Sequence, residues 1–242
     1  GFTSTLGSGT VGGTVASSAG PWELAHGYTL VVAFNAGGDQ TFTISATAAA
    51  RESTNTESTP FALSNGMTLT VKIDGGSTQT ITFLTASFVD ITNATAEEVC
   101  AVINAGLIGG TATATTGGTK VTITSDRKGT GSHVQVTGGT ANASGALNFS
   151  TSVVDGTGNV ADVSAVTAAE WVTIMSAITN GAAANDAGKL RLTSTTTGSS
   201  GTVQVKAAST ADTAMAFDNA VHAGSTGGST ATSGAMYFSG GS

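Results

Sequence analysis

The feature that most constrains this chain is that two of its segments each occur twice, at different spacings. The segment that begins at Pro21 resembles the one that begins at Pro60, 39 positions later. The segment around Glu170 resembles the one around Glu98, 72 positions earlier. Recurrence at a fixed spacing indicates repeated structural units. Because both inner segments lie between the two outer ones, the pattern predicts one module inserted into a loop of its twin.

Each module begins with a hairpin pattern. Alternating apolar residues at Leu30 and Val32 lead into turn residues that start at Asn35, and the inner copy repeats this pattern from Leu69 into a turn at Asp74. Alternation of apolar residues on both sides of a Gly-rich turn is typical of a β-hairpin.

A helix with a strong start signal follows in each module. Thr95 stands three residues before Glu98, and Thr167 stands three residues before Glu170, which is the spacing of a capping box. Val99 and Ile103 then fall on one helical face. Two or three further alternating strands complete each module, so the sequence predicts a β-rich α+β fold in which the helix covers one face of a sheet.

The predicted domain organisation has four parts. Small residues dominate 1–20 and 219–242, which we interpret as terminal arms, either free tails or segments that become ordered on a neighbouring subunit. The polar stretch 51–59 is predicted to be the joint where the inner module is inserted. The parts are an N-terminal arm (1–20), a host module (21–58 with 151–218), an inserted guest module (59–150) and a C-terminal arm (219–242).

The arms carry the predicted assembly residues. Widely spaced apolar side chains punctuate the first arm, and an apolar cluster near the end of the second arm needs a surface on which to dock. These residues are Phe2, Leu6, Val11, Val15, Met236, Tyr237 and Phe238. We expect the arms to emerge from the host and the guest to form a distal lobe.

Composition excludes several classes of protein. The 242 residues carry eight Lys and Arg and a net charge of −7, which gives no basic surface for nucleic acid. No run approaches the roughly 20 apolar residues that a membrane span needs. The single cysteine, Cys100, excludes an intrachain disulfide framework and does not identify a compartment.

No residue pattern predicts a chemistry. The three histidines, His26, His133 and His222, lack metal-ligand spacing, and Cys100 is expected to be a small buried side chain. The acidic pair at Glu97 and Glu98 is explained by the helix start. The sequence therefore predicts no catalytic, cofactor-binding or metal-binding residue, no cofactor, and no enzyme activity.

The inner module resembles repeat modules of structural proteins in tailed bacteriophages, including tail sheath-like and other virion surface proteins. The segments that carry the resemblance are Leu69-Thr-Val-Lys-Ile-Asp-Gly-Gly, Gln79-Thr-Ile-Thr-Phe, Thr95-Ala-Glu-Glu-Val-Cys-Ala-Val-Ile-Asn-Ala and Lys120-Val-Thr-Ile-Thr-Ser. With both copies it covers about 200 residues, and a sheath core is absent. The resemblance implies a building or decorating role in a virion.

The functional prediction is a structural subunit of a phage tail or capsid surface, located in the virion, with copies of itself and other virion proteins as partners. Its arms are expected to add strands to exposed sheet edges of neighbours. Two alternatives stay open. One is a bacterial extracellular fibre or surface-layer subunit. The other, weaker alternative is an adhesin that binds glycans through wide aromatic side chains. Only Trp22, Trp171, Tyr28 and Tyr237 are available for this, and Trp171 lies on the predicted buried face of its helix.

Overall fold

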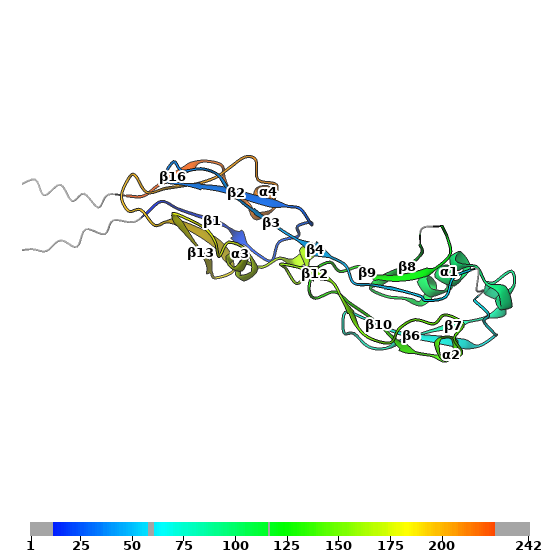
Figure 1. Cartoon of the computed structure of the whole chain (residues 1–242). Coiled ribbons are helices and arrows are strands. Elements are labelled where there is room, and N and C mark those ends of the chain that lie inside the picture. The colour runs from blue at the N-terminus through cyan, green and yellow to red at the C-terminus, as the bar shows by residue number, and fades with distance from the viewer. Residues whose placement is uncertain (1–11, 58–60, 116, 226–242) are drawn as a thin grey trace, which may run out of the picture.

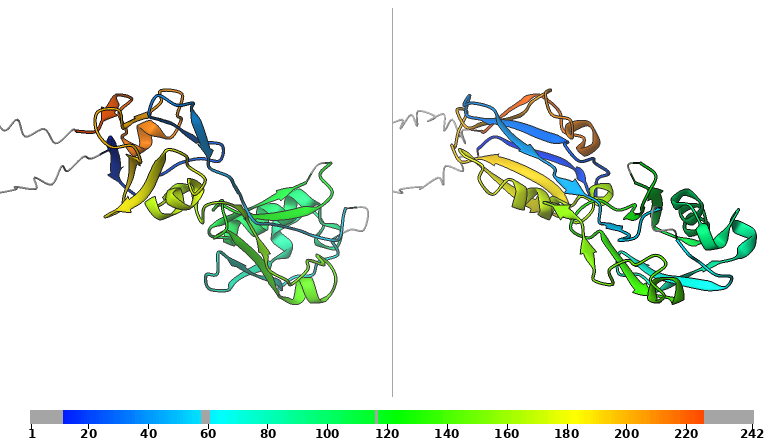
Figure 2. Two further views of the ribbon diagram at one scale, coloured as in Figure 1. Left: turned by 60° about the vertical axis from the view of Figure 1, so that its left-hand side comes forward. Right: turned by 45° about the vertical axis from the view of Figure 1, so that its right-hand side comes forward.

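The computed structural model describes residues 12–57, 61–115 and 117–225, and these fold into two lobes that follow one another along a long molecule (Figure 1). Each lobe has its own hydrophobic cluster. One cluster draws its residues from 15–46 and from 160–217, and the other from 49–149. We call the lobes the outer unit and the inner unit. Both ends of the described chain lie at the far end of the outer unit (Figures 1 and 2).

The outer unit contains two antiparallel sheets, with strand orders β1-β14-β13 and β16-β15-β2-β3. Side chains from both sheets contribute to one cluster, in which Leu30, Val203 and Leu192 are fully buried. The strands are β1 (Thr14–Ala19), β2 (Thr29–Phe34), β3 (Gln40–Thr43), β13 (Gly181–Asp186), β14 (Lys189–Ser194), β15 (Thr202–Val205) and β16 (Val221–Ala223).

The inner unit has the same arrangement, with strand orders β5-β9-β8 and β11-β10-β6-β7. Its cluster includes Leu69, Ile123 and Val134, all fully buried. The strands are β5 (Ala50–Glu52), β6 (Met67–Ile73), β7 (Gln79–Phe83), β8 (Gly110–Ala114), β9 (Val121–Ser125), β10 (His133–Gly138) and β11 (Val154–Asp155).

The two long helices begin where the sequence predicts. In α1 (Ala96–Gly106) and α3 (Ala168–Ile174), the threonine before the helix and the glutamate three residues later form a complete capping box, which confirms both predictions. Each box follows a short 3-10 turn, η2 (Ile91–Asn93) or η3 (Val163–Ala165). The remaining helical segments are η1 (Thr85–Ser87), α2 (Thr140–Ala143) and α4 (Asp212–Met215).

Each unit has two sheets, so the expectation of one sheet covered by a helix is wrong. Helix α1 instead packs against β7 at the edge of one sheet and against β8 at the edge of the other, where Val99 and Ile103 fill the space between them. The second sheet is built on the hairpin β13-β14 or β8-β9, and it is extended by β1 or β5. Both strands lie in segments that the sequence presents as polar or small-residue linkers. The β-rich α+β class of antiparallel sheets is as predicted.

The predicted N-terminal arm is wrong over residues 12–20. Strand β1 pairs with β14, Val15 is 6% exposed in the outer cluster, and Ser17 Oγ accepts a hydrogen bond from Leu190 N. The predicted C-terminal arm is likewise too long, because β16 pairs with β15. Short strands of Ser, Thr and Ala carry little apolar alternation, which is why the sequence pattern missed them.

The predicted joint at 51–59 also belongs to a folded element in part. Strand β5 pairs with β9, and the buried Ser53 accepts a hydrogen bond from Val121 N at 3.1 Å. Ala49, just before β5, is fully buried in the inner cluster. The chain therefore crosses between the units at the short strands β4 (Ala46–Thr47) and β12 (Thr157–Gly158), which pair with each other.

Candidate functional site

The contact between the units, here called the junction, is made largely by backbone groups. The loop after β9 presents Thr130 N–H to Val160 O at 2.9 Å and Gly131 N–H to Ala161 O at 2.9 Å. In the opposite direction, Val163 N–H donates to Lys128 O at 3.0 Å. Such bonds fix the register of two surfaces without requiring particular side chains.

A glycine makes this approach possible. A Cβ on Gly129 would lie 2.4 Å from Val160 O and 2.6 Å from Ala161 O, and the Gly129 backbone has a φ of +128°. Any larger residue would be costly at this position, because its Cβ would clash and because residues other than glycine rarely adopt this dihedral angle. The junction is therefore closed by direct backbone contact between the two units.

One ion pair and the two crossing strands complete the junction. Arg127 Nε lies 3.1 Å from Asp162 Oδ2. Between β4 and β12, the Thr47 and Thr157 hydroxyls lie 2.7 Å apart. Asn159 also bridges the two crossings, since its Oδ1 accepts from Ser45 N at 2.8 Å. The crossings are thus held together as a pair.

The free end of the inner unit, here called the tip (residues 84–91), has the same backbone arrangement as the outer unit's half of the junction. Glu98 Oε1 accepts from Val89 N at 2.8 Å, just as Glu170 Oε1 accepts from Ala161 N at 2.7 Å. The Thr95 and Val89 backbone N–H groups hold the pKa of Glu98 below its ordinary value. The carboxylate that orders the tip is therefore charged at neutral pH.

An aspartate fixes the next turn of the tip. Asp90 accepts hydrogen bonds from the hydroxyl and the backbone N–H of Thr92, and these bonds lower the pKa of Asp90. In the outer unit, Asp162 accepts the same two bonds from Ser164. Asp162 differs in having Arg127 of the inner unit as an ion partner.

At the opposite end of the molecule, the loop 195–201 between β14 and β15, here called the base loop, repeats the junction loop. Thr196 N donates to Ser194 Oγ and Gly201 N donates to Gly198 O, at 3.0 Å each. The junction loop makes the equivalent bonds from Arg127 N to Ser125 Oγ and from Ser132 N to Gly129 O, at 3.1 Å each.

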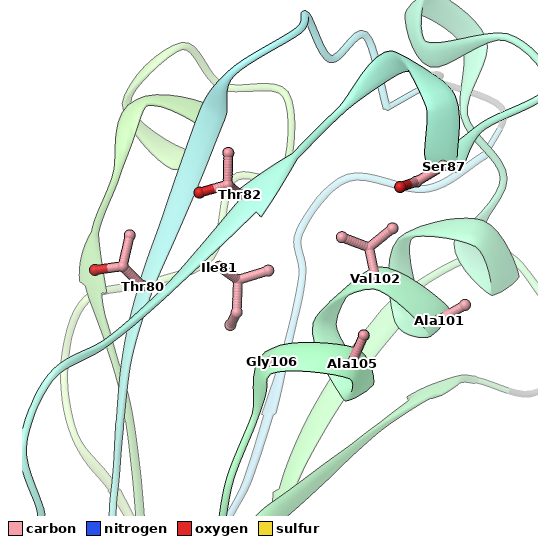
Figure 3. Close-up of a pocket in the computed structure, with 8 residues that line it drawn as sticks. All are labelled: Thr80, Ile81, Thr82, Ser87, Ala101, Val102, Ala105 and Gly106. Atoms are coloured by element: carbon pink, nitrogen blue, oxygen red, sulfur yellow. The ribbon is translucent and has the colours of Figure 1, made fainter.

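A groove of about 430 Å³ runs between β7 and α1 on the inner unit (Figure 3). Val102 and Ala105 of α1 face β7 across it, and Ile81 lies on the helix side of β7. Strand β7 is an edge strand, because only β6 pairs with it in its sheet. The groove thus gives access to an edge that could accept a further strand.

Of the predicted assembly residues, Val15 belongs to the core of the outer unit, and the others lie outside the described residues: Phe2, Leu6, Val11, Met236, Tyr237 and Phe238. The junction and base loop were not predicted. Their contacts come from the backbone, whose hydrogen-bonding groups leave no residue pattern. The Gly129 and Gly131 pair was the one available signal.

Each of the three histidines has a different hydrogen-bond partner. His26 Nδ1 accepts from Ala46 N, His133 lies 2.7 Å from Asp155 Oδ1, and His222 lies 2.7 Å from Asp218 Oδ1. Cys100 is buried as expected. Within residues 12–57, 61–115 and 117–225, no three His, Cys, Asp or Glu side chains gather as metal ligands would.

Among these same ranges, no helix is long and apolar enough to cross a membrane. Comparisons with known proteins gave no match to a family model, to a curated protein or to a solved structure.

Proposed function

We propose that the two units are copies of one module, with the inner copy inserted between β3 and α3 of the outer copy. The chain is then a non-enzymatic structural subunit of a phage particle, a tail or capsid surface component that assembles with copies of itself. The single observation that carries this proposal is the junction, in which one unit is joined to the other mainly by backbone hydrogen bonds.

Matching side-chain bonds support the duplication. Gln40 bonds both backbone groups of Thr179, accepting from N at 2.8 Å and donating to O at 2.9 Å. Gln79 bonds both backbone groups of Ile108 at 2.7 Å and 2.9 Å. Each pair ties the end of the hairpin to the segment that follows the helix. Together with equal strand orders and equal capping boxes, this correspondence favours two copies of one module.

A module that binds its own copy is suited to be the repeated subunit of an assembly. Repeated units whose contact joins two different surfaces produce extended or ring-shaped assemblies when the contact recurs between chains. The low content of charged residues, 10% of the chain, suits surfaces that are covered in an assembly. The resemblance to phage structural modules points to a virion as the place of assembly.

The terminal segments are proposed to add to these contacts. In this mechanism, residues 1–11 or 226–242 of one copy pair with an exposed sheet edge of a neighbour, such as the β7 edge beside the groove. Eleven extended residues span at most about 36–40 Å, which exceeds the length of a five-residue strand.

A bacterial extracellular fibre or surface-layer subunit is the second candidate, because it would use the same contacts. A glycan-binding adhesin has less support. Trp22 and Trp171 are 4% and 0% exposed, and Tyr28 is the only Trp or Tyr of the described part that is exposed. Stacking on a sugar requires an accessible aromatic face.

Two deletions test the assembly role. Removing 1–11 or 226–242 leaves β1 and β16 in place, so each variant should keep the thermal midpoint of the full chain. Electron microscopy should show that the full chain forms regular particles and that the deletion variants do not. Unchanged particles in both variants would contradict the role of the arms. Immunogold labelling of virions and of bacterial cells from the source then separates the phage subunit from the cell-surface fibre.

A further inference from the structure

We infer that the base loop of one copy binds the tip of a second copy, head to tail, through the same backbone hydrogen bonds that join the two units within one chain. This inference rests on the proposed function and deepens it, because it names the surfaces and the partner. The junction is the template for both sides of the contact.

The tip has the acceptors and the donor that the template requires. By the correspondence at the junction, Phe88 O and Val89 O take the places of Val160 O and Ala161 O, and Ile91 N–H takes the place of Val163 N–H. No described residue forms a hydrogen bond with any of these three tip groups. They are therefore available to a partner.

The tip backbone also has the shape of the template. Asp90 has φ −141° and ψ 101°, and Asp162 has φ −153° and ψ 118°. After the turn, Ala94 has φ −66° and ψ 142°, and Val166 has φ −65° and ψ 131°. Because the same Glu and Asp bonds hold both turns, the acceptors of the tip should point outward as those at the junction do.

The base loop supplies the complementary groups. Ser199 N–H and Ser200 N–H correspond to the junction donors Thr130 and Gly131, and Thr197 O corresponds to Lys128 O. Thr197, Ser199 and Ser200 are all exposed, and these backbone groups have no hydrogen-bond partner in the described part of the chain.

The hydrogen bonds that hold the base loop correspond to those that hold the junction loop. Thr202 N donates to Asn35 Oδ1 at 3.0 Å, and Gly224 N donates to Gly201 O at 2.8 Å. At the junction, His133 N donates to Asp74 Oδ1 and Gly156 N donates to Ser132 O, at 2.8 Å each. The base loop is therefore held by its flanking strands in the same way as the junction loop is held by its own.

Side chains around the three hydrogen bonds are compatible with this contact. Thr196 stands where Arg127 stands at the junction, and its hydroxyl accepts from Asn35 Nδ2 at 2.8 Å, so it keeps its own proton for Asp90. Val89 is 98% exposed and Leu84 is 49% exposed, and both lie at the tip. Covering them would add apolar burial to the backbone bonds.

A base-to-tip contact joins two different surfaces, so it leaves a free tip and a free base on every pair and propagates into a row or ring of subunits. Within the chain, the covalent crossings at β4 and β12 give the junction a high effective concentration. Between chains the same small contact is weak by itself, and a trapping experiment is needed to detect it.

Disulfide trapping tests the contact in the full chain. Val89→Cys and Ser200→Cys proteins are made separately, labelled with different fluorophores at the N-terminus, mixed at assembling concentration and oxidised mildly. Native Cys100 does not interfere, because it is buried. The control pair combines Val89→Cys with Thr43→Cys, an exposed position at the end of β3 near the junction.

We expect the Val89–Ser200 pair to give mixed-colour dimers in about tenfold excess over the control pair, because docking raises the local thiol concentration. Assembly of the wild-type protein is measured in parallel by sedimentation velocity. If particles form but the two pairs cross-link equally, the base-to-tip contact is wrong and the proposed function stands. If the wild-type chain stays monomeric and no excess appears, both are wrong.

Discussion

At the scale of single residues, Gly129 is the position where the junction tolerates least change. A methyl group there would meet two carbonyl oxygens of the outer unit, at 2.4 Å and 2.6 Å. We expect Gly129→Ala to lower the free energy of unfolding by about 2–4 kcal/mol, since a strained dihedral and a backbone clash add together. Urea unfolding followed by fluorescence measures this loss.

Gly138→Ala is the matched control for this substitution. Gly138 has a similar φ of +142°, but a Cβ there would meet only Thr70 Oγ1, at 3.8 Å. The control should therefore show the cost of the dihedral angle alone, about 1–2 kcal/mol. Equal losses in the two variants would mean that the two carbonyl oxygens of the outer unit make room for the methyl group without cost.

Cys100 makes stability depend on pH in the alkaline range. Burial, with a smaller contribution from the charge of Glu97, raises the pKa of this thiol from 9.0 to about 11. The unfolded chain therefore loses the proton first as the pH rises. The stabilisation is complete below pH 9 and is lost progressively between pH 9 and about 11.

The expected loss over this window is on the order of 2 kcal/mol. It should appear in the difference between the wild-type protein and Cys100→Ala, measured by urea unfolding at pH 8 and at pH 10.5. Groups other than Cys100 titrate equally in both proteins and cancel in this difference. A difference that stays constant with pH would rule out the buried thiol as its source.

At the scale of elements, the sequence predicted those whose signals are local. Thr95 with Glu98 and Thr167 with Glu170 mark helix starts because both partners lie within one turn. The hairpins β2-β3 and β6-β7 were predicted because alternation and turn residues adjoin. Strands β1, β5 and β13 were missed, since their pairing depends on distant partners and their residues are small or polar.

The candidate site was less predictable for a related reason. The junction depends on three backbone groups, Lys128 O, Thr130 N–H and Gly131 N–H. Backbone groups of this kind occur in every sequence, so they leave no pattern to recognise. What makes them a contact is the conformation of the loop, and this is set by bonds to Ser125 and Ser132. Only the proposed duplication, which rests on the spacing of the sequence and on the matching hydrogen bonds, relates the base loop and the tip to the junction.

Strand β5 gives a test of the boundaries of the inner unit. Ser53 exchanges two hydrogen bonds with Val121, and Ser125 N donates to Ala49 O at 3.0 Å. A fragment of residues 48–156 keeps these bonds, and a fragment of 59–150 loses them. At about 1 kcal/mol for each of these three bonds, the shorter fragment should be less stable by at least about 3 kcal/mol, because it also loses the β5–β9 and β10–β11 pairings.

Thermal unfolding followed by circular dichroism compares the two fragments. The longer one should unfold in one cooperative transition, because it contains the whole inner cluster apart from its contacts with the outer unit. Equal midpoints for the two fragments would show that β5 is dispensable and would favour the boundaries predicted from sequence.

At the scale of the whole molecule, the ion pair of Arg127 with Asp162 should affect the relative orientation of the two units more than the free energy of unfolding. Arg127 also donates to Gly131 O at 3.2 Å, so it braces the loop that crosses the junction. Because the Arg127 side chain is 42% exposed, Arg127→Ala should cost only about 0–1 kcal/mol. The backbone bonds and the paired crossings then hold the two units without the ion pair, and the relative motion of the units should increase.

Residual dipolar couplings of backbone amides measure this motion. In the wild-type protein, both units should fit one alignment tensor, whereas Arg127→Ala should give tensors of different magnitude for the outer and the inner unit. Lys120→Ala is the control, because it removes an ion pair of 2.7 Å with Glu52 that lies inside the inner unit. A common tensor in Arg127→Ala would mean that the backbone bonds and the paired crossings suffice to hold the units. The base-to-tip contact, in which Thr196 replaces the arginine, would then need no ion pair to fix its angle.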